Sequence, residues 1–123
     1  MNAINDRIER LLISLGITAK YTGFFYSMYA VELVASDPSH LILVTKNLYP
    51  AVAHRFSSTP SRVERNIRHA AELAWQTNRV MLQNMAGYPL LQRPCASQFI
   101  AILSAEYKNL LNREEPNGQQ CFF

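Results

Sequence analysis

Histidine and cysteine side chains are the first candidates for metal binding or catalysis in this sequence. His40, His54 and His69 lie 14 and 15 positions apart, and Cys95 and Cys121 lie 26 positions apart. Zinc sites need ligands grouped within a few residues, as in HExxH or CxxC, and neither spacing provides such a group. The pattern therefore predicts no metal site, and His54 and His69 are expected to be surface residues.

Acidic residues and glycines offer no catalytic pattern either. Glu114 and Glu115 are adjacent, but they lie in a polar segment that we expect to be too loose to hold a carboxylate pair in catalytic geometry. The four glycines are scattered and form no phosphate-binding loop. We expect no enzyme and no cofactor.

The segment from Val52 to Ile67 has the pattern of a helix-turn-helix. This motif needs a short first helix, a tight turn, and a capped second helix whose inner face is apolar. Thr59 is a suitable hydroxyl N-cap, and Pro60 suits the first helical position. A capping box formed by Ser61 and Glu64 is the alternative start, two residues later.

The second helix of this motif has one apolar and one polar face. At 100° per residue, Val63, Ile67, Ala70 and Ala74 fall within about 60° of arc. The opposite face carries Ser61, Arg65, Arg68 and Glu72, with Glu64, Arg62 and His69 on its flanks. Arginine can donate to guanine, glutamate can accept from cytosine, and a helix N-terminus favours phosphate. The pattern predicts a DNA-reading helix, with a merely solvated charged face as the alternative.

Length and composition limit what can position this helix. The chain has 123 residues, which suits one domain, and 49% of them are hydrophobic, enough for a core without disulfides or metals. The N-terminus lacks a signal-peptide pattern, and no apolar stretch is long enough to cross a membrane. We expect a cytoplasmic protein with reduced cysteines that does not contact a membrane.

Apolar residues recur at helical spacing along the chain without period-two alternation, so the predicted fold class is all-α, a compact helical bundle. We expect helices over about 4–15, 22–35, 39–48, 50–56, 60–76, 80–85 and 97–111, with 60–76 the longest. Buried positions of the second and third are expected at Phe24, Phe25, Met28, Val31, Val34, Leu41, Ile42, Val44 and Leu48. Asp37 or Ser39 is expected to cap the third helix, and Pro50 to begin the fourth. Residues 1–112 would form the domain, and 113–123 a flexible tail.

The segment from Ser61 to Trp75 resembles the recognition helix of a known family. This family is the DNA-binding effector domain of the master sporulation response regulator of endospore-forming Firmicutes. Thr45–Pro50 resembles the segment leading into that family's helix-turn-helix. Gly16, Gly23, Gly87 and the run Ser97–Ala101 follow in matching order, so the resemblance covers about residues 2 to 112.

The resemblance implies a six-helix domain that binds short promoter boxes in double-stranded DNA and regulates transcription. Arg62, Glu64 and Arg65 would contact bases, and Arg68 and His69 would contact backbone phosphates. From the residues themselves, we expect two further backbone contacts, at Ser61 and Arg55.

The resemblance also implies a homodimer on DNA that forms through the last helix, from Phe99 to Leu111, and RNA polymerase is a further candidate partner. Family members carry an N-terminal receiver domain, whereas Met1 lies almost at the first effector helix. Phosphorylation control is therefore not carried over, and both a stand-alone protein and a fragment fit the sequence. The loop from Pro89 to Ala96 departs from the family pattern as well, because Arg93 is its one basic residue.

A protein-interaction module that modulates a full-length regulator or RNA polymerase without reading DNA is the alternative function. Low charge content, 17% of residues, favours it because apolar surface would be left for a partner. The location of the charge favours DNA binding. From Lys46 to Arg79 there are six basic and two acidic residues, a balance of +4, whereas the whole chain carries only +3.

Overall fold

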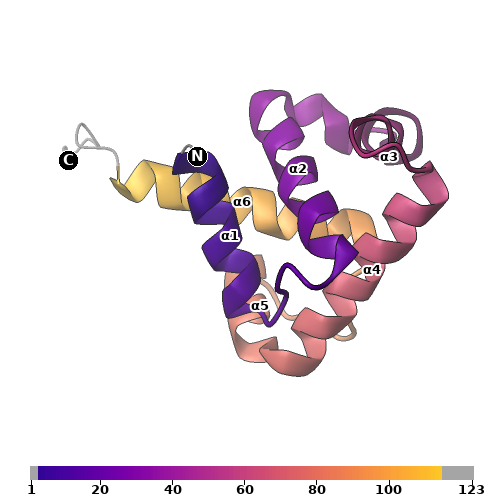
Figure 1. Ribbon diagram of the computed structural model, residues 1–123. Coiled ribbons are helices and arrows are strands. Elements are labelled where there is room, and N and C mark those ends of the chain that lie inside the picture. The colour runs from indigo at the N-terminus through magenta and orange to yellow at the C-terminus, as the bar shows by residue number, and fades with distance from the viewer. Residues whose placement is uncertain (1–2, 115–123) are drawn as a thin grey trace.

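Helical periodicity produces helices along nearly the whole described chain, which confirms the predicted all-α class. The computed structural model describes residues 3–114. Within this range there are six α-helices, one 3₁₀ helix and no strand (Figure 1). These are α1 (Ala3–Ser14), α2 (Thr22–Ser36), η1 (Pro38–Leu41), α3 (Val44–Arg55), α4 (Pro60–Thr77), α5 (Arg79–Ala86) and α6 (Ala96–Glu114).

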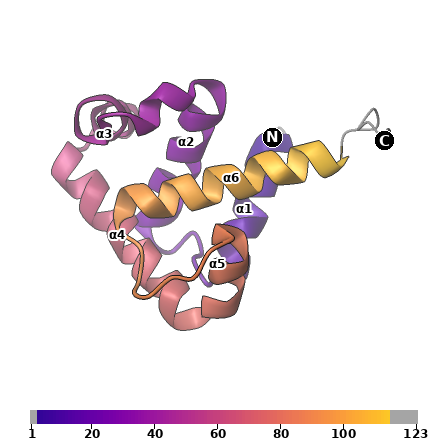
Figure 2. The same ribbon diagram turned by 180° about the vertical axis from the view of Figure 1, so that it is seen from behind.

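Helix α2 occupies the middle of the fold. It packs against α1, α3, α4 and α6, and α4 also contacts α3, α5 and α6. Figures 1 and 2 show α6 crossing behind α2, while α4 runs down one side of the molecule from α3 to α5. The arrangement leaves one side of α4 facing away from the other helices.

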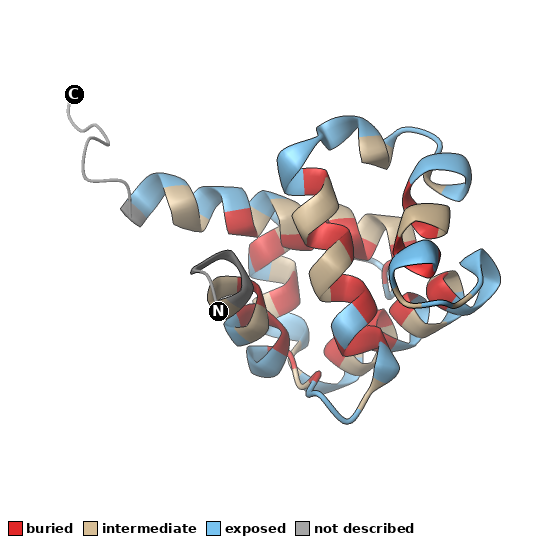
Figure 3. Cartoon of the chain, turned by 45° about the horizontal axis from the view of Figure 1, so that its top comes forward, coloured by how far each residue is buried: buried red, intermediate tan, exposed pale blue. Residues whose placement is uncertain are grey.

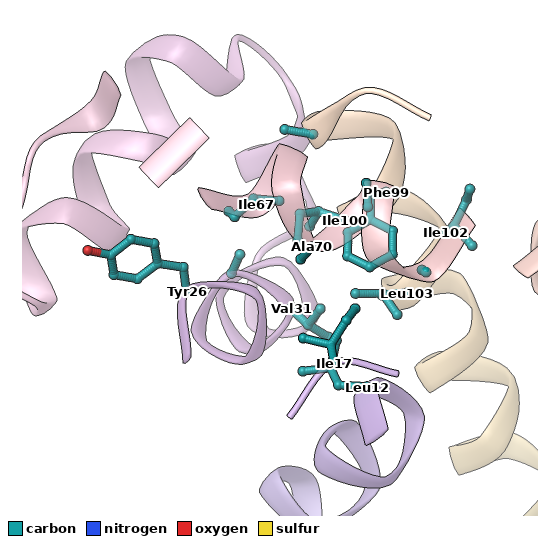
Figure 4. Close-up of a cluster of buried hydrophobic side chains, with 14 of the residues drawn as sticks. Leu12, Ile17, Tyr26, Val31, Ile67, Ala70, Phe99, Ile100, Ile102 and Leu103 are labelled. Carbon is teal, nitrogen blue, oxygen red and sulfur yellow. The ribbon is translucent and has the colours of Figure 1, made fainter. Parts of the chain in front are cut away.

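Apolar side chains from all six α-helices meet in a single core, part of which is drawn in Figure 4. Leu12 of α1, Val31 of α2, Ile67 of α4, and Phe99 and Leu103 of α6 are all completely buried. In Figure 3, buried residues lie where helices face one another, and exposed residues cover the outer sides. Each helix is apolar on one side, and packing these sides against one another removes them from water.

A glycine brings α2 unusually close to α4. Gly23 lies buried near the start of α2, and a Cβ at this position would collide with the backbone carbonyl oxygen of Asn66 on α4. Its Cβ would also meet the Ala70 methyl group at 3.2 Å. The absence of a side chain therefore sets the spacing of the two helices at this crossing.

Asn78 joins three helices at one corner of the molecule. It ends α4, and its Oδ1 accepts the N–H of Met81 at 3.3 Å, which caps α5. Its Nδ2 donates to the carbonyl oxygen of Ser14 at 3.1 Å. One side chain thus satisfies backbone groups at the end of α1 and the start of α5.

The predicted break at Pro50 is wrong, because Pro50 lies inside α3. Proline removes the hydrogen bond to the carbonyl four residues earlier, but burial of Leu48, Tyr49, Val52 and Ala53 on both sides keeps the helix continuous. The chain breaks instead at Leu43, which takes a left-handed conformation with φ 55°. Asp37 is a cap as predicted, but its side chain caps the 3₁₀ helix η1 through the N–H of Ser39.

Two residues predicted to be buried are exposed. Ile42 is 64% exposed because it lies in the extended link between η1 and α3, where no helix covers it. Phe25 is 44% exposed because its position on α2 points away from the packed face that holds Phe24. The edge of the Phe25 ring contacts the Phe24 ring, with centroids 5.1 Å apart.

The helix ends also differ from the prediction. Arg113 and Glu114 belong to α6 rather than to a tail, and this helix has 19 residues against 18 in α4. The side chain of Ile4, and residues 115–123 with Cys121, lie outside the described residues.

Candidate nucleic-acid interface

Helices α3 and α4 form the predicted helix-turn-helix. Helix α3 ends at Arg55, and Ser57 in the turn adopts a left-handed conformation with φ 53°. The N–H of Ser58 then donates to the carbonyl of Ala53 at 2.8 Å, which closes the turn. This reversal places α4 against α3, and the two helices are in contact.

The N-terminus of α4 is capped at the residue that the sequence predicts. Thr59 has extended backbone angles, and its Oγ1 accepts the N–H of Arg62 at 3.2 Å. Pro60 is the first helical residue. The helix therefore starts before the alternative capping box of Ser61 and Glu64, which is wrong.

The inner face of α4 is buried as predicted. Val63, Ile67, Ala70 and Ala74 are at most 1% exposed, and Ala71 is buried with them. Because this stripe fixes the rotation of α4, the remaining side chains must face outward.

The structure brings most of the predicted DNA contacts together on the outer side of α4. Ser61, Arg62, Arg65, Arg68 and His69 are exposed, and Glu64 is half-buried. Within residues 3–114, no hydrogen bond or ion pair engages the guanidinium groups of Arg62 or Arg65. Both cations are therefore available to an anionic partner.

Glu64 and Arg68 are already paired with each other. The Arg68 Nε lies 3.1 Å from Glu64 Oε2, and its Nη2 lies 3.3 Å from Oε1. The pair is one helical turn apart and both side chains are partly exposed, so it contributes little to stability. It does hold the carboxylate and the guanidinium side by side in the free protein.

His69 and Arg55 lie at the borders of this face. The His69 ring contacts Tyr21 edge to face, with centroids 5.9 Å apart. Arg55 is exposed at the end of α3, where its guanidinium lies 5.7 Å from the Tyr29 ring centroid. Burial raises the pKa of the neighbouring Glu32, and the Arg55 charge partly opposes this shift. Arg55 is thus drawn toward α2 rather than onto α4.

A hollow of about 440 Å³ runs beside the first turns of α4. Thr45 and Tyr49 of α3 line it together with Glu64, Arg65 and Arg68. Burial, followed by the nearby Glu64 charge, raises the pKa of Tyr49 to about 12. Thr45 and Tyr49 are not among the site residues predicted from the sequence, although the segment Thr45–Pro50 leads into the motif.

A second hollow of about 760 Å³ lies further along α4, toward the loop before α6. Arg68, Trp75, Arg93 and Gln98 are among its lining residues. Arg93 Nη1 pairs with Glu72 Oε2 at 3.4 Å, so a residue from the loop adds a cation beside the outer face of α4. Arg93 was not predicted as a site residue, although it could have been identified from the sequence as the one basic residue of that loop.

Cys95 lies in the same hollow and is exposed. The Ser97 hydroxyl, 3.5 Å from the Cys95 sulfur, lowers the pKa of that thiol. Within residues 3–114, three or more histidine, cysteine or acidic side chains do not gather in a way that could hold a metal ion. The same part of the chain contains no helix with the length and apolar character of a membrane span.

Comparison with known families gives one match over most of the chain. The family model described as "Sporulation initiation factor Spo0A C terminal" matches residues 8–107. The matched range contains α2 to α5 completely, and with them the helix-turn-helix and both hollows.

Proposed function

Because this chain belongs to the family of the Spo0A C terminal, the DNA-binding domain of sporulation regulators, we propose that it reads short double-stranded promoter boxes sequence-specifically, with α4 in the major groove. An α-helix with its side chains is about 10–12 Å across and fits a major groove about 12 Å wide. A helix-turn-helix presents the N-terminal part of its second helix to base edges. In α4 this part carries the exposed arginines.

The observation that carries the proposal is the pair of unengaged guanidinium groups at Arg62 and Arg65. Each is exposed on α4, and no ion pair within residues 3–114 would have to break before it meets a base. A bidentate arginine–guanine contact discriminates against a wrong base by about 1–3 kcal/mol. Two such contacts are enough to give a short box a strong preference.

Glu64 would serve as the third base contact, and Arg68 as a phosphate contact. A glutamate can accept from the amino group of cytosine, and an arginine can clamp phosphate oxygens. Their mutual ion pair holds Glu64 in place on the outer face until DNA offers both side chains new partners. The exchange is inexpensive because an exposed pair of this type is weak.

Ser61, His69 and Arg55 complete the proposed backbone contacts. Ser61 stands at the N-terminus of α4, where the helix dipole favours a phosphate. His69 is held by Tyr21 at one edge of the face, and Arg55 lies at the end of α3. Contacts of this kind position the protein on DNA without reading the sequence.

Selection of bound duplexes from a random pool tests the proposal directly. We expect one enriched motif, and we expect Arg62→Ala and Arg65→Ala each to weaken binding to that motif by about 1–3 kcal/mol while relaxing one base position. Arg10→Ala is the matched control, since it removes an exposed arginine from α1. An absence of any enriched motif at moderate salt would refute sequence-specific reading.

A salt titration separates base contacts from phosphate contacts. Arg68→Ala should weaken binding equally on all sequences and lower the slope of log affinity against log salt by about 1. If Arg68→Ala changed the base preference instead, its assignment to the backbone would be wrong.

We also propose that two copies bind neighbouring boxes as a homodimer through α6. Phe99, Ile100, Leu103 and Tyr107 are buried inside one copy, so the contact would use the residues of α6 that the core leaves free. RNA polymerase remains a candidate partner of the DNA-bound form. Sedimentation of the free protein and of its complex with a two-box duplex measures how many copies each contains, and so tests the homodimer.

A further inference from the structure

An apolar groove shares no lining residue with the two hollows beside α4. The end of α2 and the 3₁₀ helix η1 form one wall, and the C-terminal half of α6 forms the other. Its volume is about 480 Å³, which is within the range of pockets that bind small apolar groups. The lining residues are Val34, Ala35, Pro38, Leu41, Ala101, Ser104, Ala105, Tyr107, Lys108, Leu111 and Asn112.

Small side chains create this groove. Ala35, Ala101 and Ala105 each line it with only a methyl group, whereas Leu41 and Leu111 line it with larger side chains. An open site with small residues along its length and apolar walls accommodates a flat, bulky apolar group. Nothing within residues 3–114 fills it.

The segment that follows α6 contains such groups. Residues 115–123 are polar up to Gln120 and then read Cys121, Phe122 and Phe123. Pro116 and Gly118 are residues that favour a change of chain direction. The single acidic residue of the segment, Glu115, has the charge opposite to that of Lys108, which lines the groove.

The reach of the segment matches the position of the groove. The groove extends along α6 from Asn112 back to Ala101, about 16 Å at 1.5 Å per residue. Nine residues span up to about 30 Å when extended, so Phe122 and Phe123 can return to any point along it. A short tether also gives an effective concentration in the millimolar range, so a weak apolar contact suffices for occupancy.

We propose that residues 115–123 fold back and place Phe122 and Phe123 in the groove between η1 and α6 of the same chain. The occupant is the chain itself, bound through aromatic rings against alanine and leucine side chains. A covered groove removes apolar surface from α6, so the segment competes with any second copy for this helix. The inference does not depend on DNA reading by α4.

A spin label tests the contact in the full chain. Replacing Cys95 with serine leaves Cys121 as the single thiol for labelling, because the sequence has two cysteines. We expect the amide signals of Val34, Ala35 and Leu41, across the groove from α6, to relax at least threefold faster than those of Arg10 on α1. Equal effects on both sides of α6 would overturn the proposal.

Two pairs of variants check that the aromatic rings and the groove carry the contact. Phe122→Ser combined with Phe123→Ser should abolish the difference between the two sides. In the unlabelled protein it should shift amide signals mainly at Val34, Ala35 and Leu41. Ala105→Lys should have the same effect as the serine substitutions by filling the groove, whereas Asn109→Lys, at an exposed α6 position that does not line it, should not. A loss in both lysine variants, or in neither, contradicts docking at this site.

Mixed samples distinguish folding back from exchange between copies. Labelled protein without ¹⁵N, mixed with unlabelled ¹⁵N protein, reports only contacts between different molecules. We expect no enhanced relaxation at Val34 or Leu41 in this mixture. If the enhancement appeared only there, the groove would bind the segment of a second copy and the proposal would be wrong.

Discussion

Helices α4 and α6 are the two longest helices of the domain and pack against each other, yet their free sides differ in chemistry. The free side of α4 carries Arg62, Arg65 and Arg68, whereas α6 contributes Ala101, Ala105 and Leu111 to a largely apolar groove. Both helices bury one apolar face in the same core. The difference shows that the buried face sets how each helix is rotated, whereas the residues on the opposite face determine what the helix can bind.

The contrast also predicts how each surface responds to salt. A polyanion bound by arginines releases counterions, so its affinity falls as salt rises. Apolar contacts in a groove weaken little with salt and depend on buried area instead. If this comparison is right, residues on the buried faces should contribute much more to the free energy of unfolding than residues on the exposed faces.

The largest expected effect is the loss of a core ring from α6. Phe99→Ala should lower the free energy of unfolding by about 3–5 kcal/mol, because Phe99 is completely buried and the cavity cannot fully collapse. Urea denaturation measures the change, with Phe25→Ala as the control at a half-exposed phenylalanine. Equal losses in the two variants would contradict the assignment of the buried face of α6.

The second effect concerns Tyr49, a buried residue of α3 that lies near Glu64 of α4. The pKa of Tyr49 is about 12 in the folded protein and about 10 in the unfolded chain, so folding favours its neutral form. The stability contributed by this group is complete below pH 10 and is lost as the pH rises to 12. We expect a loss of about 2–3 kcal/mol relative to Tyr49→Phe over this interval. Parallel pH profiles of the two proteins would show that Glu64 and burial do not act on Tyr49.

The third effect lies at the start of α4. Thr59→Ala should lower the free energy of unfolding by about 1 kcal/mol, because the N–H of Arg62 loses its acceptor. Thr22→Ala, at the exposed first position of α2, should change it much less. If the two variants lost the same stability in thermal denaturation, the Thr59 cap would not be what fixes the N-terminus of α4.

The smallest effect separates stability from binding on the outer face. Glu64→Gln should lower the free energy of unfolding by only about 0.3–0.5 kcal/mol at low salt, and by less at high salt. Glu72→Gln, which breaks the pair with Arg93, is the matched control. A loss above about 1 kcal/mol would mean that the outer face of α4 also holds the fold together.

Local chemistry made α4 predictable from the sequence. Thr59 and Pro60 mark its start through short-range hydrogen bonding and a fixed φ, and the stripe from Val63 to Ala74 depends only on helical periodicity. The predicted rotation, and with it the exposure of Arg62 and Arg65, followed from these features alone. The contacts of these arginines with DNA remain predictions.

Long-range packing explains what the sequence did not predict. Pro50 is a local helix breaker, but burial of Tyr49 and Val52 outweighs its lost hydrogen bond. Arg93 reaches α4 only because the loop before α6 folds across 21 positions of sequence to Glu72. Neither the continuous helix at Pro50 nor the pairing of Arg93 can be predicted from the residues that neighbour them in the sequence.

The hydrogen bond from Asn78 to the Ser14 carbonyl joins positions 64 residues apart. During synthesis, α2 can therefore cover α1 early, whereas the Ser14 carbonyl at the end of α1 lacks this donor until the corner at Asn78 has left the ribosome. Assembly of the domain is accordingly completed late in translation, and a pause before that corner would prolong the lifetime of a partly folded intermediate with exposed apolar surface.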